Sequence, residues 1–519
     1  MVYAVAMKTI AHFEKALGRE AMWADHDPAG GQKGQFLQRL RVHPHALRAA
    51  NAFYSPAKKA LLFGYFRAGT DGLHVPGSTV FSCLSSDIVA HETAHALLDG
   101  MHSRFIEPTH PDGLAFHEAF ADIVAIFQHF TLPEVLKHQI AQTQGDLSKT
   151  NLLAELAQEF GRATGCRRAL RSALGTKPDP EALRTIVEPH ARGSILVAAM
   201  FDAFLKIYQR RAQRVIGLAT QGSGVLPPGA LTPNLVDALA QEAAKTALHF
   251  LNASIRALDY CPPVDINFGD FLRALITADA DLVPSDARGY RIAIVDAFRD
   301  RGIFPDGVRN LSEESLLWPS CGYSASWFIE ELRTELLKIQ YAASRAERWE
   351  RSRDLRAWLH DRLAQEPNQD LEDFSSATGL VLGSKKLSGL HRSGANHSPV
   401  FEVHVLREAR RAAPDGSIRN QVIVSLTQKR IIPAGHGLPE FKFRGGATLI
   451  VDLDSLSLKY CISKRIDDDV RLARQLSFLR DGLPPAIRAA FFGNSQTSKY
   501  FEPLAMLHSG DWQETSYAD

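Results

Sequence analysis

Two histidines with a glutamate between them are the residues of this chain best suited to chemistry. His91 and His95 are four residues apart, so on a helix both imidazoles would lie on one face and could bind one cation. Glu92 directly follows His91 and could reach a water molecule on that cation. The flanking segments from Ile88 to Leu98 are apolar, which favours a buried helix over a solvent-exposed polar pair. The motif therefore predicts a zinc site, which needs a third protein ligand.

A second apolar helix can supply that third ligand. Glu118 and Asp122 are again four residues apart, and two carboxylates on a buried face require cations or hydrogen-bond donors. We expect Glu118 to bind the metal and Asp122 to accept a hydrogen bond from a metal-binding imidazole. His117 is an alternative ligand, although its side chain would point about 100° away from that of Glu118.

The order of these motifs resembles the gluzincin metallopeptidases, specifically the thermolysin-like branch. The resemblance covers roughly residues 1–310. It rests on the HExxH helix, the following ExxxD helix, the segment Asn51–Tyr54, Asp87 four residues before the motif, and the segment His190–Ile195. It implies a zinc-dependent endopeptidase that hydrolyses internal peptide bonds through a zinc-activated water.

The resemblance also implies a role for each residue in a matching position. His91, His95 and Glu118 would bind one catalytic zinc ion, and Glu92 would be the general base. His190 would hydrogen-bond the oxyanion, with His110 as a substitute for the tyrosine that the family uses as second donor. The other implied roles are orientation of His91 by Asp122, a supporting position for Asp87, binding of the substrate backbone by Asn51 and Ala52, carbonyl binding by Arg171, and an apolar pocket lined by Ile88 and Leu170. The acidic cluster that binds calcium in the family is mostly absent, so calcium is not predicted.

Composition restricts the partners and the compartment that we expect. The 519 residues include 59 Lys and Arg against 58 Asp and Glu, a net charge of +1, so nucleic acid is not the default partner. No apolar run of about 18 residues is present, so no membrane span is expected. The five cysteines lie far apart and predict free thiols in a reducing compartment. Together with the lack of a secretory signal at the start of the sequence, this predicts a cytoplasmic protein.

The expected fold class is α+β. A thermolysin-like, two-lobed catalytic unit would have a mixed β N-terminal lobe with the zinc helix (1–100) and a mostly helical lobe (101–345). A charged helix and polar linker (346–379) would then lead to a small accessory α+β domain with an antiparallel sheet (380–519). Alternating apolar residues over 401–405, 422–426, 447–451 and 456–462 predict the strands of that sheet.

The predicted peptidase would cleave a dedicated intracellular protein target, for example in a bacterial regulatory or defence module. Residues 366–519 or a partner protein would restrain it. One alternative is a binding or scaffold protein that keeps the metallopeptidase fold without catalysis. Another is a zinc aminopeptidase, although the chain has no GxMEN-like segment to bind a substrate's N-terminus.

Overall fold

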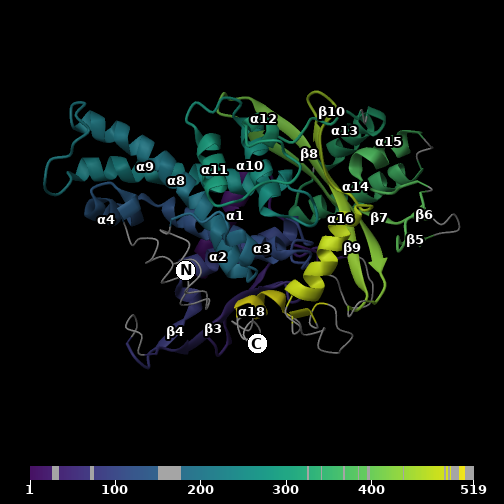
Figure 1. Cartoon of the computed structure of the whole chain (residues 1–519), viewed down its shortest axis with the longest axis horizontal. Helices are drawn as coiled ribbons and strands as arrows, with labels where there is room; N and C mark the ends of the chain where they lie inside the picture. Colours follow the sequence, from purple (N-terminus) through teal and green to yellow (C-terminus); the bar gives the residue numbers. More distant parts are fainter. Residues whose placement is uncertain are drawn as a thin grey trace.

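The chain folds as a mixed α+β protein. The computed structural model describes residues 1–25, 34–69, 75–149, 177–323, 326–340, 342–365, 369–383, 385–393, 398–435, 438–483, 487–488, 491 and 502–508. Helices from the first two thirds of the sequence gather at one end of the molecule, and an antiparallel sheet from the last third lies at the other end (Figure 1). The expected α+β class and its antiparallel sheet are confirmed.

A small sheet near the start of the chain provides one wall of the candidate site. Its strands are β1 (Arg41–Leu47), β2 (Ala52–Ser55), β3 (Ala60–Arg67) and β4 (Thr79–Phe81). β3 pairs with β1 in parallel and with β2 antiparallel, so β2 lies at an edge. Edge strands usually have an exposed side. Here every residue of β2 is buried, because helices α2 (Ser86–Met101) and α18 (Pro503–His508) pack against it.

The helical part surrounds two almost wholly buried helices. Side chains from Asp87 to Met101 of α2 are all buried, and α3 is buried over most of its length. Both contact neighbouring helices, so apolar residues cover all their faces instead of one stripe. The helices and short 3-10 turns of this part are α1 (Val2–Leu17), η1 (Ser82–Leu84), α2 (Ser86–Met101), α3 (Pro111–Phe130), α4 (Pro133–Thr143), η2 (Leu147–Lys149), α7 (Ala182–Thr185), α8 (Pro189–Ala219), α9 (Pro233–Ala257), η3 (Leu258–Tyr260), α10 (Phe268–Leu282), α11 (Tyr290–Asp300) and α12 (Glu313–Leu316).

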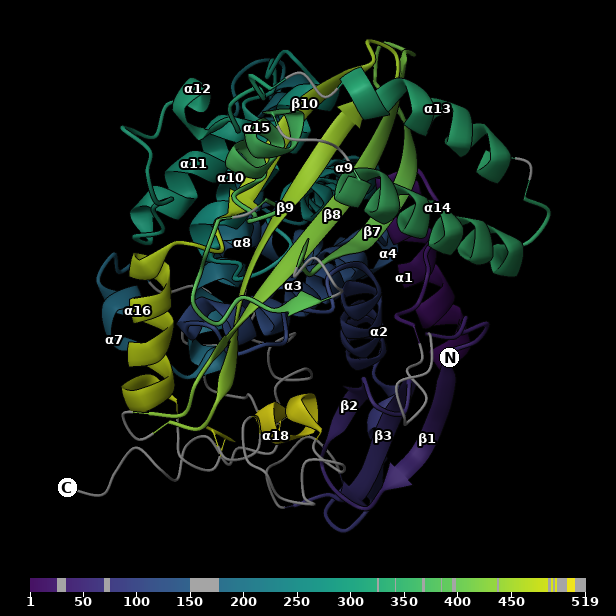
Figure 2. The same ribbon diagram turned by 90° about the vertical axis from the view of Figure 1, so that its right-hand side faces the viewer.

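The second sheet is an antiparallel meander in the order β10-β9-β8-β7. Its strands are β7 (Phe401–Ala412), β8 (Ile418–Ile432), β9 (Phe441–Asp452) and β10 (Ser457–Lys464), with a small pair β5 (Arg392–Ser393) and β6 (Ser398–Pro399) nearby. The period of two sends neighbouring residues to opposite faces. Leu449 and Val451 pack with helices α13 (Ser326–Gln340) and α14 (Arg345–Gln365), whereas Ile450 joins the core of the helical part. Figure 2 shows α13 and α14 lying across the outer face of this sheet.

Two predicted features of the middle of the chain are wrong in detail. The sequence from 326 to 363 is amphipathic and predicts one long helical stretch, but the structure has two helices there, α13 and α14. The expected polar linker contains helix α15 (Gln369–Thr378), because Phe374 is fully buried against the sheet and anchors that turn. The sheet also shares a hydrophobic core with the helical part, so the expected boundary at 379 is not a break in packing.

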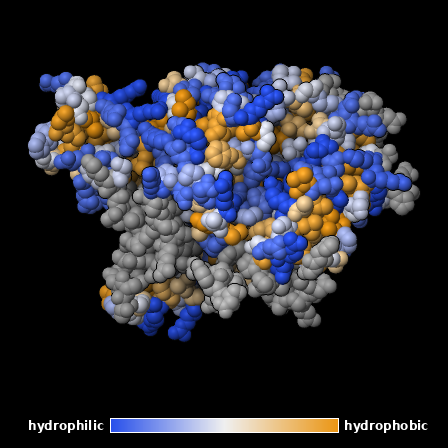
Figure 3. All heavy atoms as spheres, in the orientation of Figure 1, coloured by the Kyte–Doolittle hydropathy of each residue, from blue (hydrophilic) through white to orange (hydrophobic). Residues whose placement is uncertain are grey.

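The remaining elements follow β10. These are α16 (Asp469–Ser477), the single π turn η4 (Phe478–Gly482) and α18 (Pro503–His508). Hydrophilic and hydrophobic residues are interspersed over the face of the molecule shown in Figure 3. Cys83, Cys261, Cys321 and Cys461 are free thiols, and the fifth cysteine, Cys166, lies outside the described residues. Among the described residues no single helix is long and apolar enough to cross a membrane, whereas the bent pair α3–α4 meets that test by length and composition.

Candidate metal centre

The two helices that carry the predicted metal ligands are fixed at their starts by side-chain caps. Ser85 precedes α2 and accepts a hydrogen bond from the N–H of Ile88. His110 precedes α3, and its Nδ1 accepts from the N–H of Asp112, with Pro111 at the first helical position. Because α2 and α3 pack against each other, their inward faces meet between them.

Four potential ligand atoms converge at that meeting point. One atom each from His91, His95, Glu118 and His508 lies within 4.8 Å of the others, and all four side chains are buried. Nε2 of His91 is 2.9 Å from Nε2 of His95, and Oε2 of Glu118 is 3.4 Å and 3.7 Å from these two atoms. Nε2 of His508 is 3.2 Å from Oε2 of Glu118. The group could hold a metal ion.

The spacing and chemistry of this group fit zinc. Ligands that each lie about 2.0–2.1 Å from a tetrahedral centre are about 3.3 Å apart, and the measured separations scatter around that value. Three imidazoles and one carboxylate are also a donor set that zinc accepts. The second carboxylate oxygen of Glu118, Oε1, is buried without a hydrogen-bond partner, which is costly unless a cation compensates it.

Each histidine of the HExxH motif has a partner at its other ring nitrogen. Nδ1 of His91 is 2.9 Å from Oδ1 of Asp122. Asp122 therefore lies beside His91, where the sequence predicts that it orients that imidazole. Nδ1 of His95 is 2.7 Å from Nδ1 of His117. His117 therefore lies behind His95 and supports it, and it is not in the four-residue group. Such partners fix the tautomer and orientation of metal-binding imidazoles.

Glu92 lies between the ligand group and strand β2. Its Oε2 accepts a hydrogen bond of 2.8 Å from the backbone N–H of Tyr54, and its Oε1 lies 3.8 Å from Nδ1 of His508. One carboxylate oxygen is thus held by the edge strand, while the other, buried without a hydrogen bond, points into the site. Tyr54 is itself fixed, since its hydroxyl donates to Asp99 at 2.7 Å.

His190 reaches the same site from α8. Its Nε2 lies 3.4 Å from Oε2 of Glu118, and its Nδ1 lies 3.1 Å from Oε1 of Glu188. Gly193 makes this approach possible, because a Cβ there would lie only 2.8 Å from the carbonyl oxygen of Ala115 on α3. The absence of a side chain lets α8 pack closely on α3.

The charge states of the buried groups suit a cation site. Burial works to raise the pKa of Glu118, but His508, His95 and His190 outweigh it and hold that pKa well below its usual value. Burial lowers the pKa of His95 well below its usual value, which favours a neutral imidazole with a free lone pair. Burial raises the pKa of the Glu92 carboxyl.

The other residues predicted from the sequence lie at different distances from the ligand group, some beside it and some at the ends of the helices. Ala52 faces the site through its carbonyl oxygen, which accepts from Nδ1 of His508 at 2.7 Å, and Asn51 precedes it. Ile88 is fully buried in the apolar cluster that also contains Phe53. Asp87 pairs with His129 at 2.9 Å at the start of α2.

For three of the residues predicted from the sequence, the described part of the structure gives no contact with the ligand group. His110 caps α3, and its charged neighbours are Asp112, Asp265, Arg474 and Lys464. Arg171 and Leu170 lie outside the described residues.

His508 is the member of the site that sequence reasoning missed. It follows Glu118 by 390 residues, and neither a motif nor a fixed spacing links the two. The one local signal is the apolar run from Leu504 to Leu507 before it, which indicates a buried helix without indicating its neighbour.

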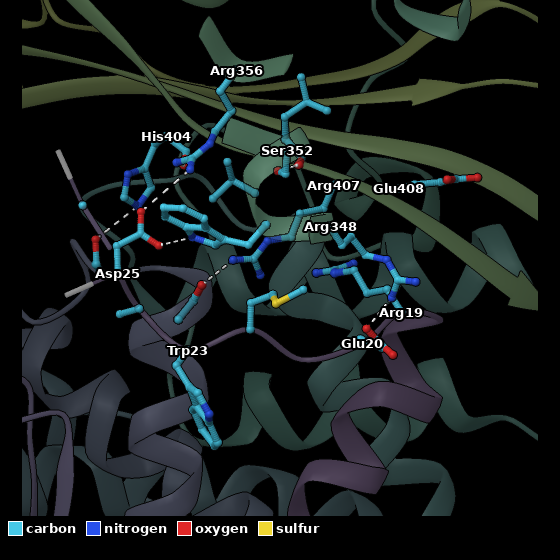
Figure 4. Close-up of a pocket in the computed structure, with 18 of the residues that line it drawn as sticks. Arg19, Glu20, Trp23, Asp25, Arg348, Ser352, Arg356, His404, Arg407 and Glu408 are labelled. Atoms are coloured by element: carbon cyan, nitrogen blue, oxygen red, sulfur yellow. Dashed lines mark hydrogen bonds and ion pairs between the residues drawn. The ribbon is translucent and has the colours of Figure 1, made fainter. Parts of the chain in front are cut away.

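A separate hollow lies beside the C-terminal end of α2. This cavity of about 810 Å³ is lined by Asp99 and Gly100 of α2, by Trp23, and by Arg356 and Arg407, among others. Figure 4 shows several arginines around it, with Arg407 and Arg356 reaching in from the sheet and from α14. The residues that line it include none of the four potential ligands, so it is not the place where a metal-dependent reaction would occur.

Comparisons with protein-family models, with curated proteins and with solved structures found no match to this chain. The functional argument therefore rests on the geometry of the site.

Proposed function

We propose that this chain is a zinc-dependent endopeptidase whose centre is built from His91, His95 and Glu118, with Glu92 as general base. The observation that carries the proposal is the position of Glu92, whose free oxygen Oε1 points into the ligand group while Oε2 is held by the N–H of Tyr54. A carboxylate that only supported the helix would have no reason to lie buried between a metal site and an edge strand. The thermolysin-like arrangement of lobes is part of the same proposal.

Zinc in this site would act as a Lewis acid and would make a nucleophile available at neutral pH. The protein side chains supply the proton transfers. Glu92 takes a proton from the attacking water at Oε1, and the same oxygen returns it to the nitrogen of the leaving amine. The bond to Tyr54 keeps the carboxylate in one orientation through both transfers.

His190 stabilises the charge that develops on the substrate carbonyl oxygen. Glu188 accepts a hydrogen bond from Nδ1 of His190 and so favours the doubly protonated ring, in which Nε2 also carries a proton to donate. A donor aimed at an oxyanion contributes about 3 kcal/mol to such a reaction. Strand β2 would bind the substrate as an added strand, since its edge runs beside Glu92.

A Glu92→Gln variant tests this function. The amide keeps the size of the side chain and removes the base, so peptide cleavage should fall by about 100- to 10,000-fold while zinc content stays unchanged. N-terminal mapping of proteins from cells that express either the original chain or the variant would show the cleavage sites and identify the target. Equal sets of new N-termini from both chains would exclude the proposal.

A second candidate function has one specific observation in its favour. Structural zinc sites are closed by four protein ligands, and His508 makes this site a four-ligand group. In that case the chain would be a binding or scaffold protein, and Glu92→Gln would alter neither cleavage nor partner binding.

A further inference from the structure

We propose that residues 502–508, here called the plug segment, inhibit the metal centre from within the chain. His508 takes the coordination position that hydrolysis requires, and the plug segment lies along strand β2 where a substrate would bind. The inference rests on the proposed function and adds its regulation. Figure 2 shows α18, which makes up most of the plug segment, beside β2 and below α2.

The tautomer of His508 is the one that binds a metal. A carbonyl oxygen can only accept, so the 2.7 Å bond between Nδ1 of His508 and the oxygen of Ala52 places a proton on Nδ1. Nε2 is then the ring nitrogen that faces the ligand group, 3.2 Å from Oε2 of Glu118, and its lone pair would become available to a metal once Nε2 gives up its proton. The edge strand thus orients His508 as Asp122 orients His91.

The position of His508 is also the position that the reaction needs. A catalytic zinc ion keeps one coordination place open, whereas four protein ligands close it. His508 lies between the ligand group and Glu92, with its Nδ1 3.8 Å from Oε1 of that carboxylate. The ring therefore separates the general base from the place where it would meet water.

The plug segment uses the polar groups that would bind a peptide. Besides the bond to Ala52, Nδ2 of Asn51 lies 3.5 Å from the carbonyl oxygen of Ala505. At the far end of β2, the hydroxyl of Ser55 donates to Glu502 at 2.6 Å. These contacts follow the length of the strand that the proposed function assigns to the substrate backbone.

Apolar side chains hold the plug segment in place. Leu504 is fully buried and Leu507 is 4% exposed, and both belong to the apolar cluster that contains Phe53 and Ile88. Burying two leucines contributes about 3–6 kcal/mol in area terms, which is enough to keep the segment seated in most molecules.

The outer end of the plug segment is held more weakly. Glu502 pairs with Lys58 at 2.8 Å, but the lysine side chain is 61% exposed and such an ion pair contributes little, so the hydroxyl of Ser55 is the main contact that holds Glu502. Displacement would therefore start at Glu502 and withdraw His508 last, which opens the coordination place only after the segment has left β2.

The test uses the full-length chain loaded with Co²⁺, whose absorption spectrum reports the ligands of the ion. In the original chain we expect azide to leave the spectrum unchanged, because His508 fills the fourth position. In His508→Ala the three remaining ligands should keep the ion, and azide should shift the spectrum. Cleavage of a fluorogenic peptide library should rise at least about tenfold, since activity scales with the fraction of open molecules.

Hydrogen exchange at the plug segment gives a readout that does not depend on activity. Amides of residues 504–508 should exchange at least about tenfold more slowly with zinc than with chelator in the original chain, and should lose this dependence in His508→Ala. Glu502→Lys repeats the test without touching a metal ligand, should the first variant fail to fold. It should speed exchange of the same amides and raise cleavage. His138→Ala, an exposed histidine on α4, is the matched control and should behave as the original chain does.

The outcomes separate this inference from the proposed function. If azide binds the ion only in His508→Ala, and hydrogen exchange in the original chain depends on the metal, but no variant cleaves peptides, the inhibitory role of the plug segment is supported and the peptidase is excluded. Two results would overturn the inhibitory role of the plug segment and leave the peptidase proposal intact. One is equal cleavage by the original chain and His508→Ala. The other is hydrogen exchange at the plug segment that does not change when the metal is removed. Loss of the ion from His508→Ala would also overturn it, because His508 would then be a structural ligand.

Discussion

Nε2 of His508 lies 3.2 Å from Oε2 of Glu118, although 390 residues separate them along the chain. The metal group thus joins the first helices of the chain to its last described helix. Both side chains are almost completely buried, so the contact is part of the packed interior and not a surface association. A metal ion that binds this group should therefore stabilise the chain well beyond helices α2 and α3.

We predict that zinc stabilises the folded chain in a way that depends on Glu118. At a free zinc concentration about a thousand times Kd, the free energy of unfolding should rise by about 4 kcal/mol. Thermal unfolding with zinc and with chelator would show this as a shift of the midpoint. Glu118→Gln should remove most of the shift, and His138→Ala should keep it. A full shift in Glu118→Gln would place the zinc elsewhere.

We predict that Asp122→Asn weakens zinc binding without unfolding the chain. Oδ1 of Asp122 lies 2.9 Å from Nδ1 of His91, and losing such a partner costs about 10- to 100-fold in metal affinity. Competition with a chromophoric chelator measures the effect. Asp415→Asn, in the exposed turn before β8, is the control. An unchanged affinity in Asp122→Asn would show that His91 needs no partner to bind.

The sequence was sufficient where a local pattern determined the answer. Helical spacing predicted that His91, His95 and Glu118 would meet, and the structure brings them together, because residues on one helix keep fixed relations to each other and the two apolar helices pack against each other. The alternation of apolar and polar residues predicted the hairpins of the second sheet, because over a long segment a period of two fits a strand and does not fit a helix.

The sequence was insufficient where distant segments meet. His508 joins the site through the packing of Leu504 and Leu507 on a cluster assembled from both ends of the chain, and no local pattern encodes that partner. His117 could be placed on the correct helix, but its contact with His95 depends on how α2 and α3 are rotated against each other. The linker prediction failed because one buried aromatic, Phe374, outweighed a polar composition.

We predict that His102 makes stability depend on pH. Burial lowers the pKa of His102 to about 4, against 6.5 in the unfolded chain, with Asp259 acting in the opposite sense and Arg407 in the same sense. Between these values the unfolded chain binds the extra proton, so stability falls as pH decreases from 6.5 towards 4. The loss from this group should reach about 3 kcal/mol at pH 4.

The variant His102→Gln isolates that contribution. Glutamine has no proton to gain, and its amide can still donate to the carbonyl oxygen of Leu258, which Nε2 of His102 contacts at 2.8 Å. Urea titrations give the free energy of unfolding of the original chain minus that of His102→Gln. This difference should be about 3 kcal/mol smaller at pH 4 than at pH 7.5. A difference independent of pH would mean that folding leaves the pKa of His102 at its value in the unfolded chain.

We predict that Asp259 holds the helical part and the second sheet together. Its two carboxylate oxygens accept from Arg19, after α1, and from Arg411, on β7, and all three side chains are at least nine-tenths buried. Removing one member leaves buried charges without compensation, which costs about 3–5 kcal/mol. Asp259→Ala should therefore lower the free energy of unfolding by that amount.

The unfolding transition of Asp259→Ala distinguishes two forms of that coupling. Because Ile450 and Ile462 of the sheet lie in the core of the helical part, we expect fluorescence and circular dichroism to report one transition in both chains. Glu350→Ala removes an exposed carboxylate from α14 and should change stability by less than about 0.5 kcal/mol. Two separate transitions, with the change at Asp259 confined to one of them, would show that the sheet folds independently of the metal centre.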